Sequence, residues 1–439
     1  MKTFLFLTLL GSALASFGQT FPYPVKTKTL SNGLKVISIE KRDIPMVNIQ
    51  VWYRVGSKDE VPGQRGMAHL FEHMMFRGSK NFKGEGDVYI HEIEKMGGQV
   101  NAYTTFDRTV YFQQIPKQYA EKVLMMEADR MSNLILDQKV LDVEREVVGE
   151  ELRNGRNSWA QRYQSDRHEQ LYPAGHPYKV DVIGYLEEIL KFTTQECQAF
   201  HEKYYAPNNA FLIVGGDISA DSAFLLAEKA FKDAKPSVIV PTPTPNGLGS
   251  MPVFEEPKTL DVPLQIYSFI ANRPGYSNPD YAAFNVCASL LFNNPTSRVQ
   301  STLVDEQKLI FGLFNTDNGG EVFDCRTTID LLMRAGPGNV KVKKVMQREI
   351  NEFIENGPED QELADYFSNV EAGMVQQYYT LGNVVNVIGA SEFQFKDPMA
   401  MYRNFEMQKK VTKADLQRVA AAYFGPGKMG FINYKPKEE

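Results

Sequence analysis

The short run His69-Leu70-Phe71-Glu72-His73 contains the residue types that bind and use a catalytic metal ion. Two histidines four residues apart on a helix project from the same face, so both imidazoles can bind one ion. Zinc takes neutral imidazole and carboxylate ligands, and a catalytic zinc site keeps one position for water. Glu72 lies beside His73, where its carboxylate can take a proton from zinc-bound water and later pass it to a leaving amine. The run therefore predicts a hydrolase with one Zn²⁺ per chain, bound by His69 and His73.

The alternative is a pair of ordinary histidines on a helix surface. Only six histidines occur among 439 residues, and in such a chain the His-x-x-Glu-His pattern is expected about 0.006 times by chance. The other four histidines lack a second histidine at ligand spacing. His91 is expected on a helix surface. His168 and His201 are expected among charged residues, and His176 in a loop. The metal-site interpretation is therefore restricted to the His-x-x-Glu-His run.

The elements around this run predict an α+β fold. Gly66 can mark the start of the helix that carries the histidines, and Gly78 its end. Strands with alternating hydrophobicity are expected at 35–39, 47–53 and 110–114, and long amphipathic helices at 117–133 and 137–154. Hairpins and helices are interleaved without a regular βαβ rhythm, which favours α+β over a doubly wound parallel sheet.

The chain also repeats itself. Thr193, Tyr204, Pro207 and Ile213 recur 219 positions later as Thr412, Tyr423, Pro426 and Ile432. Such a constant offset indicates a tandem duplication of two similar domains, each a mixed or antiparallel sheet packed with helices. The Pro- and Gly-rich stretch 236–258 is the expected linker. We place the domain with the zinc site at 20–235 and a similar domain without a metal site at 259–439.

The first residues, MKTFLFLTLLGSALASFGQT, are typical of a secretory signal peptide. The apolar run ends near Leu14, so it is shorter than the roughly 20 residues of a membrane anchor. Small residues allow cleavage after Ala15 or near Gly18. We therefore expect residues 1–18 to be a signal peptide and the protein to be exported, periplasmic or secreted, with no stable membrane anchor.

Charge and cysteine content exclude other classes of protein. The 48 basic and 54 acidic residues give a net charge of −6, and no Lys/Arg-rich run occurs. Nucleic acid is not an expected partner, because phosphate neutralisation needs clustered positive charge. Cys197, Cys287 and Cys325 are odd in number and widely spaced, which predicts buried thiols and neither a disulfide scaffold nor a thiolate metal site.

The zinc run resembles the inverted zinc motif of the M16 family of metalloendopeptidases, which includes pitrilysin, insulinase and mitochondrial processing peptidase. Further similar stretches lie at 98–104, 109–111, 144–151 and 205–209, and the likeness extends from about Pro22 to the C-terminus. The resemblance implies the LuxS/MPP-like metallohydrolase fold, with two similar α+β domains per half-molecule and four around a closed chamber. It also implies a zinc-dependent endopeptidase whose substrates are extended or unfolded peptides.

The resemblance places the substrate on a strand beside the zinc. Asn101, Ala102, Tyr103 and Thr104 lie where the family has an edge strand that pairs with the substrate backbone. Such pairing selects extended peptides with little demand on their side chains. The alternative is an ordinary core strand.

The third zinc ligand is Glu151 or Glu150. Family spacing points to Glu150, whereas the local family pattern, a glutamate seven residues after another and just before an apolar residue, points to Glu151 and Glu144. Seven residues are about two helical turns, so Glu144 and Glu151 share a face with Val147, while Glu150 lies on the wetter side near Arg153. We expect Glu151 to bind zinc and Glu144 to support it.

The second repeat departs from the family pattern. Active chambers usually carry an Arg and, seven residues later, a Tyr that hold the substrate carbonyl and the developing oxyanion; here Val304 and Phe311 stand at those positions. Neither can donate a hydrogen bond, and losing such donors costs about 10²-fold or more in turnover. We therefore expect a heterodimer with a second M16-like chain that carries the Arg/Tyr pair. A homodimer, and a non-catalytic scaffold like the core subunits of respiratory complexes, are the alternatives.

Overall fold

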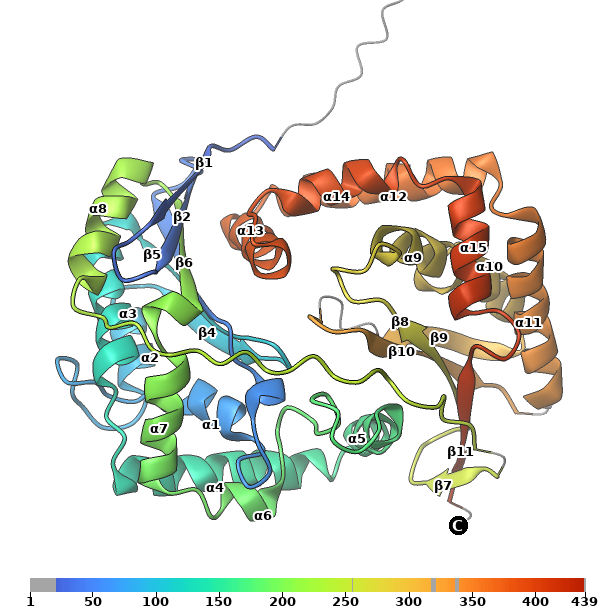
Figure 1. The fold of residues 1–439 in the computed structure, drawn as a ribbon, viewed down its shortest axis with the longest axis horizontal. Coiled ribbons are helices and arrows are strands. Elements are labelled where there is room, and N and C mark those ends of the chain that lie inside the picture. The colour runs from blue at the N-terminus through green and yellow to red at the C-terminus, as the bar shows by residue number, and fades with distance from the viewer. Residues whose placement is uncertain (1–20, 255, 317–320, 336–338, 438–439) are drawn as a thin grey trace, which may run out of the picture.

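The computed structural model describes residues 21–254, 256–316, 321–335 and 339–437 (Figure 1). The predicted signal peptide at 1–18 lies outside these residues. Each half of the chain contributes one β-sheet with its own helices, so the predicted α+β fold is confirmed.

The first half forms a six-stranded sheet in the order β1-β2-β6-β3-β5-β4. β2 and β6 pair in parallel, and all other neighbours pair antiparallel. The strands are β1 (Val25–Thr29), β2 (Lys35–Glu40), β3 (Met46–Tyr53), β4 (Gln99–Thr104), β5 (Thr109–Pro116) and β6 (Ala210–Gly216). β4 is an edge strand, as the resemblance implied.

Eight α-helices accompany this sheet within the described residues: α1 (Met67–Met74), α2 (Val88–Lys95), α3 (Ala120–Asn133), α4 (Gln138–Gly155), α5 (Trp159–Leu171), α6 (Leu186–Ile189), α7 (Thr194–Tyr204) and α8 (Ala220–Phe231). Short 3₁₀ turns lie at Ser57–Asp59, Lys117–Tyr119 and Pro207–Asn209. The helix expected at 117–133 therefore begins as a 3₁₀ turn, and the one expected at 137–154 is α4.

The second half repeats the topology in a five-stranded sheet with the order β7-β11-β8-β10-β9. β7 and β11 pair in parallel and the others antiparallel, which is the pattern of the first sheet without β1. The strands are β7 (Lys258–Leu260), β8 (Ile266–Arg273), β9 (Ile310–Thr316), β10 (Cys325–Met333) and β11 (Gly430–Pro436). The helices are α9 (Tyr281–Ala288), α10 (Arg298–Gln300), α11 (Asn339–Asn356), α12 (Asp360–Gln377), α13 (Leu381–Phe395), α14 (Ala400–Gln408) and α15 (Lys413–Tyr423), with π-helical turns η4 (Ser289–Asn293) and η5 (Ser301–Glu306).

Matching helix caps show why the repeated residues recur. The Thr193 side chain caps α7 in a capping box with Glu196, and Thr412 caps α15 in the same way with Asp415. Each box satisfies backbone N–H groups that a helix start leaves without partners. Both helices then lead into a strand of the parallel pair, β6 or β11. The predicted duplication is confirmed at this level of detail.

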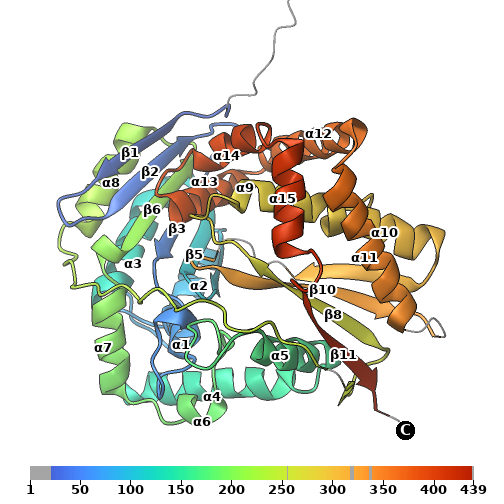
Figure 2. The same cartoon turned by 45° about the vertical axis from the view of Figure 1, so that its right-hand side comes forward.

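Each half lends one helix to the other half's sheet (Figures 1 and 2). α13 packs Val384, Val385 and Ile388 against Ile37 and Trp52 of the first sheet. Burial on this second face explains why β3 has buried residues almost throughout.

The converse contact is made by α5. Its residues Tyr163 and Leu171 pack with Ile270 and Ile432 of the second sheet. The chain segment between the sheets crosses from one half to the other (Figure 1). Because helices are exchanged, the domain limits 20–235 and 259–439 and the linker 236–258 stay a prediction.

The cysteines are as the sequence predicts: Cys197, Cys287 and Cys325 are buried thiols that form no disulfide with one another. Within the described ranges, none of the helices combines the length and hydrophobicity that crossing a bilayer requires.

Three histidines outside the zinc run are more buried than the sequence suggests. His201 is buried and His168 stacks on Phe106, although both have charged neighbours in the sequence. His176 lies in a loop, as expected, but it is buried there. Aromatic neighbours explain this: His201 stacks on Phe71 and Tyr205. Tyr205 follows His201 at the end of the same helix, α7, whereas Phe71 belongs to α1, so its contact cannot be seen in the local sequence.

Burial of His201 predicts an acid-sensitive step in stability. Burial lowers the pKa of His201 to about 4, from 6.5. The unfolded imidazole takes up a proton near its ordinary pKa and the folded one does not, so this stabilisation is present above pH 6.5 and is lost as the pH falls towards 4. The loss amounts to about 3 kcal/mol. We expect His201→Gln to flatten the decline of denaturant unfolding free energy over this range. His91→Gln, an exposed control on α2, should leave it unchanged; an equal decline in both variants would contradict the assignment.

Candidate metal centre

Helix α1 presents the predicted zinc residues because its other face is core. Met67, Leu70 and Phe71 are buried in the main cluster of the first half, which leaves His69, Glu72 and His73 on the opposite side. Gly66 is the N-cap residue with φ +95°, a left-handed conformation that favours glycine, and a Cβ there would lie 2.7 Å from the Ile183 carbonyl oxygen. Gly66 therefore marks the helix start as predicted, whereas the helix ends at Met74, before Gly78.

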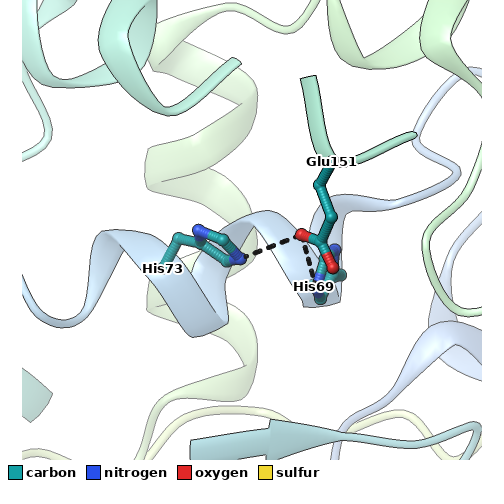
Figure 3. Close-up of side chains that lie close together, drawn as sticks. All are labelled: His69, His73 and Glu151. Atoms are coloured by element: carbon teal, nitrogen blue, oxygen red, sulfur yellow. Dashed lines mark ion pairs between the residues drawn. The ribbon is translucent and has the colours of Figure 1, made fainter. Parts of the chain in front are cut away.

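The structure brings His69, His73 and Glu151 together (Figure 3). Glu151 Oε2 lies 3.7 Å from His69 Nε2 and 3.6 Å from His73 Nε2. One ligand atom from each residue lies within 4.8 Å of the others. Two imidazoles and one carboxylate form the ligand set of a catalytic zinc site with an open fourth position. The residues present therefore fit a zinc ion.

The surroundings of the two imidazoles shift their pKa values in opposite directions. Burial and the neighbouring His73 lower the pKa of His69 to about 3, so its ring is neutral at neutral pH, as a metal ligand must be. Burial also opposes protonation of His73, but the carboxylates of Glu144, Glu72 and Glu151 outweigh it and raise that pKa. The site is thus a cluster of negative charge that favours a bound cation.

Glu144 lies against His73, and this differs from the expectation that it would support Glu151. Its Oε2 is 3.6 Å from His73 Nδ1, and its Oε1 accepts from the guanidinium of Arg77. A carboxylate at Nδ1 orients the ring so that Nε2 faces the metal position. Glu144 is buried, and Arg77 is the partner that sequence reasoning did not identify.

The two adjacent carboxylates of α4 diverge as the periodicity predicts. Glu150 points away from the histidines and pairs with Arg153. Glu151 points at them, yet 47% of its side chain is exposed and Val147 is 42% exposed. The face that Glu151 shares with Val147 is therefore not buried in the core, because this part of α4 borders an open cavity.

That cavity adjoins the metal position and the edge strand. Its volume is about 680 Å³, and His69, Glu72, Tyr103, Thr104 and Glu151 contribute to its lining. Thr104 Oγ1 donates to Glu72 Oε2 at 2.6 Å. Burial raises the pKa of Glu72, and the Thr104 hydroxyl partly opposes the shift. A carboxylate that holds a proton more readily suits a group that must accept one and later return it.

Comparison with known proteins is decisive for the family. Residues 35–179 match the family described as insulinase, peptidase family M16, and residues 191–369 match the one described as peptidase M16 inactive domain. The chain belongs to peptidase family M16. The two matches span both repeats. No metal ligand in the second repeat was predicted from the sequence.

Individual M16 proteins are similar to this chain over nearly its whole length. The zinc protease PqqE of Helicobacter pylori is 28% identical over 98% of this chain and 96% of its own. A protease from Helicobacter pylori has a similar crystal structure, with TM-score 0.82 and 26% identity over 94% of this chain and all of that one. The periplasmic protease PqqL from Escherichia coli matches with TM-score 0.77 and 20% identity, over 94% of this chain but 48% of its own.

The second repeat lacks hydrogen-bond donors at the positions where the M16 pattern has Arg and Tyr. Val304 lies in η5 and packs against the core of the second half. Phe311 lies on β9, the edge strand of the second sheet, and is 54% exposed. The Arg334 guanidinium stacks on its ring, 4.4 Å from the centroid. The side chains of Val304 and Phe311 therefore supply no donor, although the Arg334 guanidinium lies against the Phe311 ring.

Proposed function

We propose that this chain is the zinc-binding subunit of an endopeptidase that cleaves extended or unfolded peptides in a closed chamber. The observation that carries the proposal is the convergence of His69 Nε2, His73 Nε2 and Glu151 Oε2 beside the Glu72 carboxylate. A bound zinc ion would supply Lewis acidity toward a water molecule and the scissile carbonyl. The two imidazoles and Glu151 would hold it.

Glu72 would act as the base. Its carboxylate accepts a proton from the attacking water and then donates it to the leaving nitrogen. The Thr104 hydroxyl holds one Glu72 oxygen, Oε2, so Oε1 is the oxygen that can serve the water. Glu144 would not exchange protons with substrate, because it is buried behind His73 and paired with Arg77.

β4 would bind the substrate backbone. Thr105 N–H donates to Arg108 O in the hairpin that joins β4 to β5, so by alternation Asn101 and Tyr103 direct their backbone groups to β5 and Ala102 directs its groups outward. The Asn101 side chain accepts from the outward Ala102 N–H at 2.8 Å. A peptide added at this edge would replace that local hydrogen bond and run past Glu72.

The chamber requires a partner. This chain spans about half of the PqqL chain that it matches, which supports a half-molecule that pairs with another. We propose a heterodimer whose second M16-like chain carries the Arg/Tyr pair, with a homodimer as the alternative. We also propose export, with residues 1–18 as the signal peptide; the similar PqqL is described as periplasmic.

Metal removal tests the proposal. The purified chain should contain about one zinc, and the preparation that hydrolyses an unfolded peptide, alone or with its partner, should lose the activity after dialysis against a chelator. Stoichiometric zinc should restore it, because the metal supplies the Lewis acidity. Hydrolysis that persists in a zinc-free sample would show that another group does the chemistry.

A second assay separates the oligomeric alternatives. We expect the pure chain to be a weak peptidase and the double change Val304→Arg, Phe311→Tyr to raise its turnover by about 10²-fold, the value of a pair of donors to the tetrahedral intermediate. Each single change is the control, because one donor alone should recover less. Full activity of the pure wild-type chain, unimproved by the double change or by a partner, would contradict the heterodimer.

One alternative function has an observation in its favour. The apolar Val304 and Phe311, and the match of the second half to an inactive-domain family, suit a scaffold subunit without catalysis. Stoichiometric zinc without hydrolysis, alone and with every M16-like partner, would support the scaffold.

A further inference from the structure

A buried carboxylate outside the zinc run holds the start of α1. Glu60 follows the 3₁₀ turn Ser57–Asp59 and is 4% exposed. Its Oε2 accepts from Gly66 N–H and its Oε1 from Ala68 N–H, both at 2.8 Å. Gly66 has no side chain with which to cap the helix, and the first turn of α1 contains no acidic residue. Glu60 thus replaces the missing cap from six residues upstream.

The opposite end of α1 is also fixed by buried groups. Tyr111 donates its hydroxyl hydrogen to Phe71 O at 3.0 Å, and Arg130 Nη1 donates to Met75 O at 3.3 Å. A carboxylate at the N-terminus and a guanidinium at the C-terminus both complement the helix dipole. The eight-residue helix is therefore held at both ends.

We propose that Glu60 is a positioning residue for the metal centre: its carboxylate, through Gly66 and Ala68, sets where α1 begins and so where His69 and His73 present Nε2 to Glu151. This role rests on the proposed function. Ala68 directly precedes His69, so a change in its backbone position moves the first imidazole. The ligands of a metal site must be positioned to within about 0.5 Å. The third ligand, Glu151, belongs to a different helix, α4, so it does not move with α1.

The bidentate geometry needs a carboxylate. Glutamine at position 60 would keep one acceptor oxygen but place its NH₂ group against the second backbone N–H, donor facing donor. The start of α1 would then shift or lose one bond. Aspartate keeps both acceptors but is one methylene shorter, so it should reach only one of the two N–H groups.

The test measures zinc affinity by competition with a chelator, together with the visible absorption of the Co²⁺-substituted chain, which reports ligand geometry. We expect Glu60→Gln to weaken zinc binding by about 10-fold or more, as groups that orient metal ligands do, and to change the cobalt spectrum. Glu60→Asp should give a smaller effect in the same direction.

The matched control is Asp129→Asn. Asp129 is 5% exposed and its carboxylate also accepts a backbone N–H, from Asn81, but it holds the loop after α1. This variant should lose comparable stability while its zinc affinity stays within about twofold of the wild type. Wild-type zinc affinity and cobalt spectrum in a folded Glu60→Gln or Glu60→Asp chain would overturn the role of Glu60. Absence of zinc binding in the wild type would instead overturn the proposed function.

Discussion

Glu72→Gln is expected to retain zinc and to lower peptide hydrolysis by about 10²- to 10⁴-fold, the usual contribution of a general base. The amide has nearly the same size and can still accept from the Thr104 hydroxyl, which donates to Glu72 Oε2. It cannot take a proton from water. The fold and the metal ligands should therefore be preserved while proton transfer is lost.

The measurement compares turnover and zinc content in whichever wild-type preparation hydrolyses an unfolded peptide, alone or with its partner. Glu94→Gln is the control, because Glu94 is an exposed glutamate on the neighbouring helix α2. It should have wild-type turnover. If Glu72→Gln turned over peptide at the wild-type rate with its zinc in place, Glu72 could not be the base.

The two histidine ligands could be predicted from sequence because their geometry is local, whereas the region of the third ligand, on α4, was indicated by the family resemblance. The i, i+4 spacing of His69 and His73 places both side chains on one helix face whatever the rest of the fold does. The seven-residue spacing of Glu144 and Glu151 likewise determines which of two adjacent carboxylates turns toward the histidines, and the structure agrees. The helical period and the residue spacing were sufficient to predict which side chains of one helix share a face.

Features that depend on several elements could not be predicted in this way. An amphipathic pattern shows that α13 has a buried face but not that this face covers Trp52 of the other half's sheet. Glu60, before a loop rich in glycine and proline, resembles a surface residue in sequence although it is buried. Neither the Thr104 bond to Glu72 nor the Arg77 bond to Glu144 follows from spacing, because each joins segments that are distant in the chain.

The pair Glu150 and Glu151 offers the sharpest test of the metal ligands. Glu151→Gln is expected to weaken zinc binding by about 100-fold or more, since even groups that only orient ligands cost 10- to 100-fold. The change removes the one anionic ligand, whose Oε2 lies 3.6 Å and 3.7 Å from the two imidazole nitrogens. His73→Ala should abolish stoichiometric zinc, because it leaves one imidazole and one carboxylate to bind the ion.

Glu150→Gln is the matched control, one residue away on the same helix with the same chemical change. Glu150 is exposed and pairs with Arg153, and exposed ion pairs are worth about 0–1 kcal/mol. Its zinc affinity should therefore equal that of the wild type, with a small change in stability. Competition with a chelator ranks the zinc affinities of the wild type, Glu150→Gln and Glu151→Gln. If Glu150→Gln lost zinc and Glu151→Gln kept it, the family spacing would be right, and α4 would have to be rotated by about 100° to bring Glu150 to the histidines.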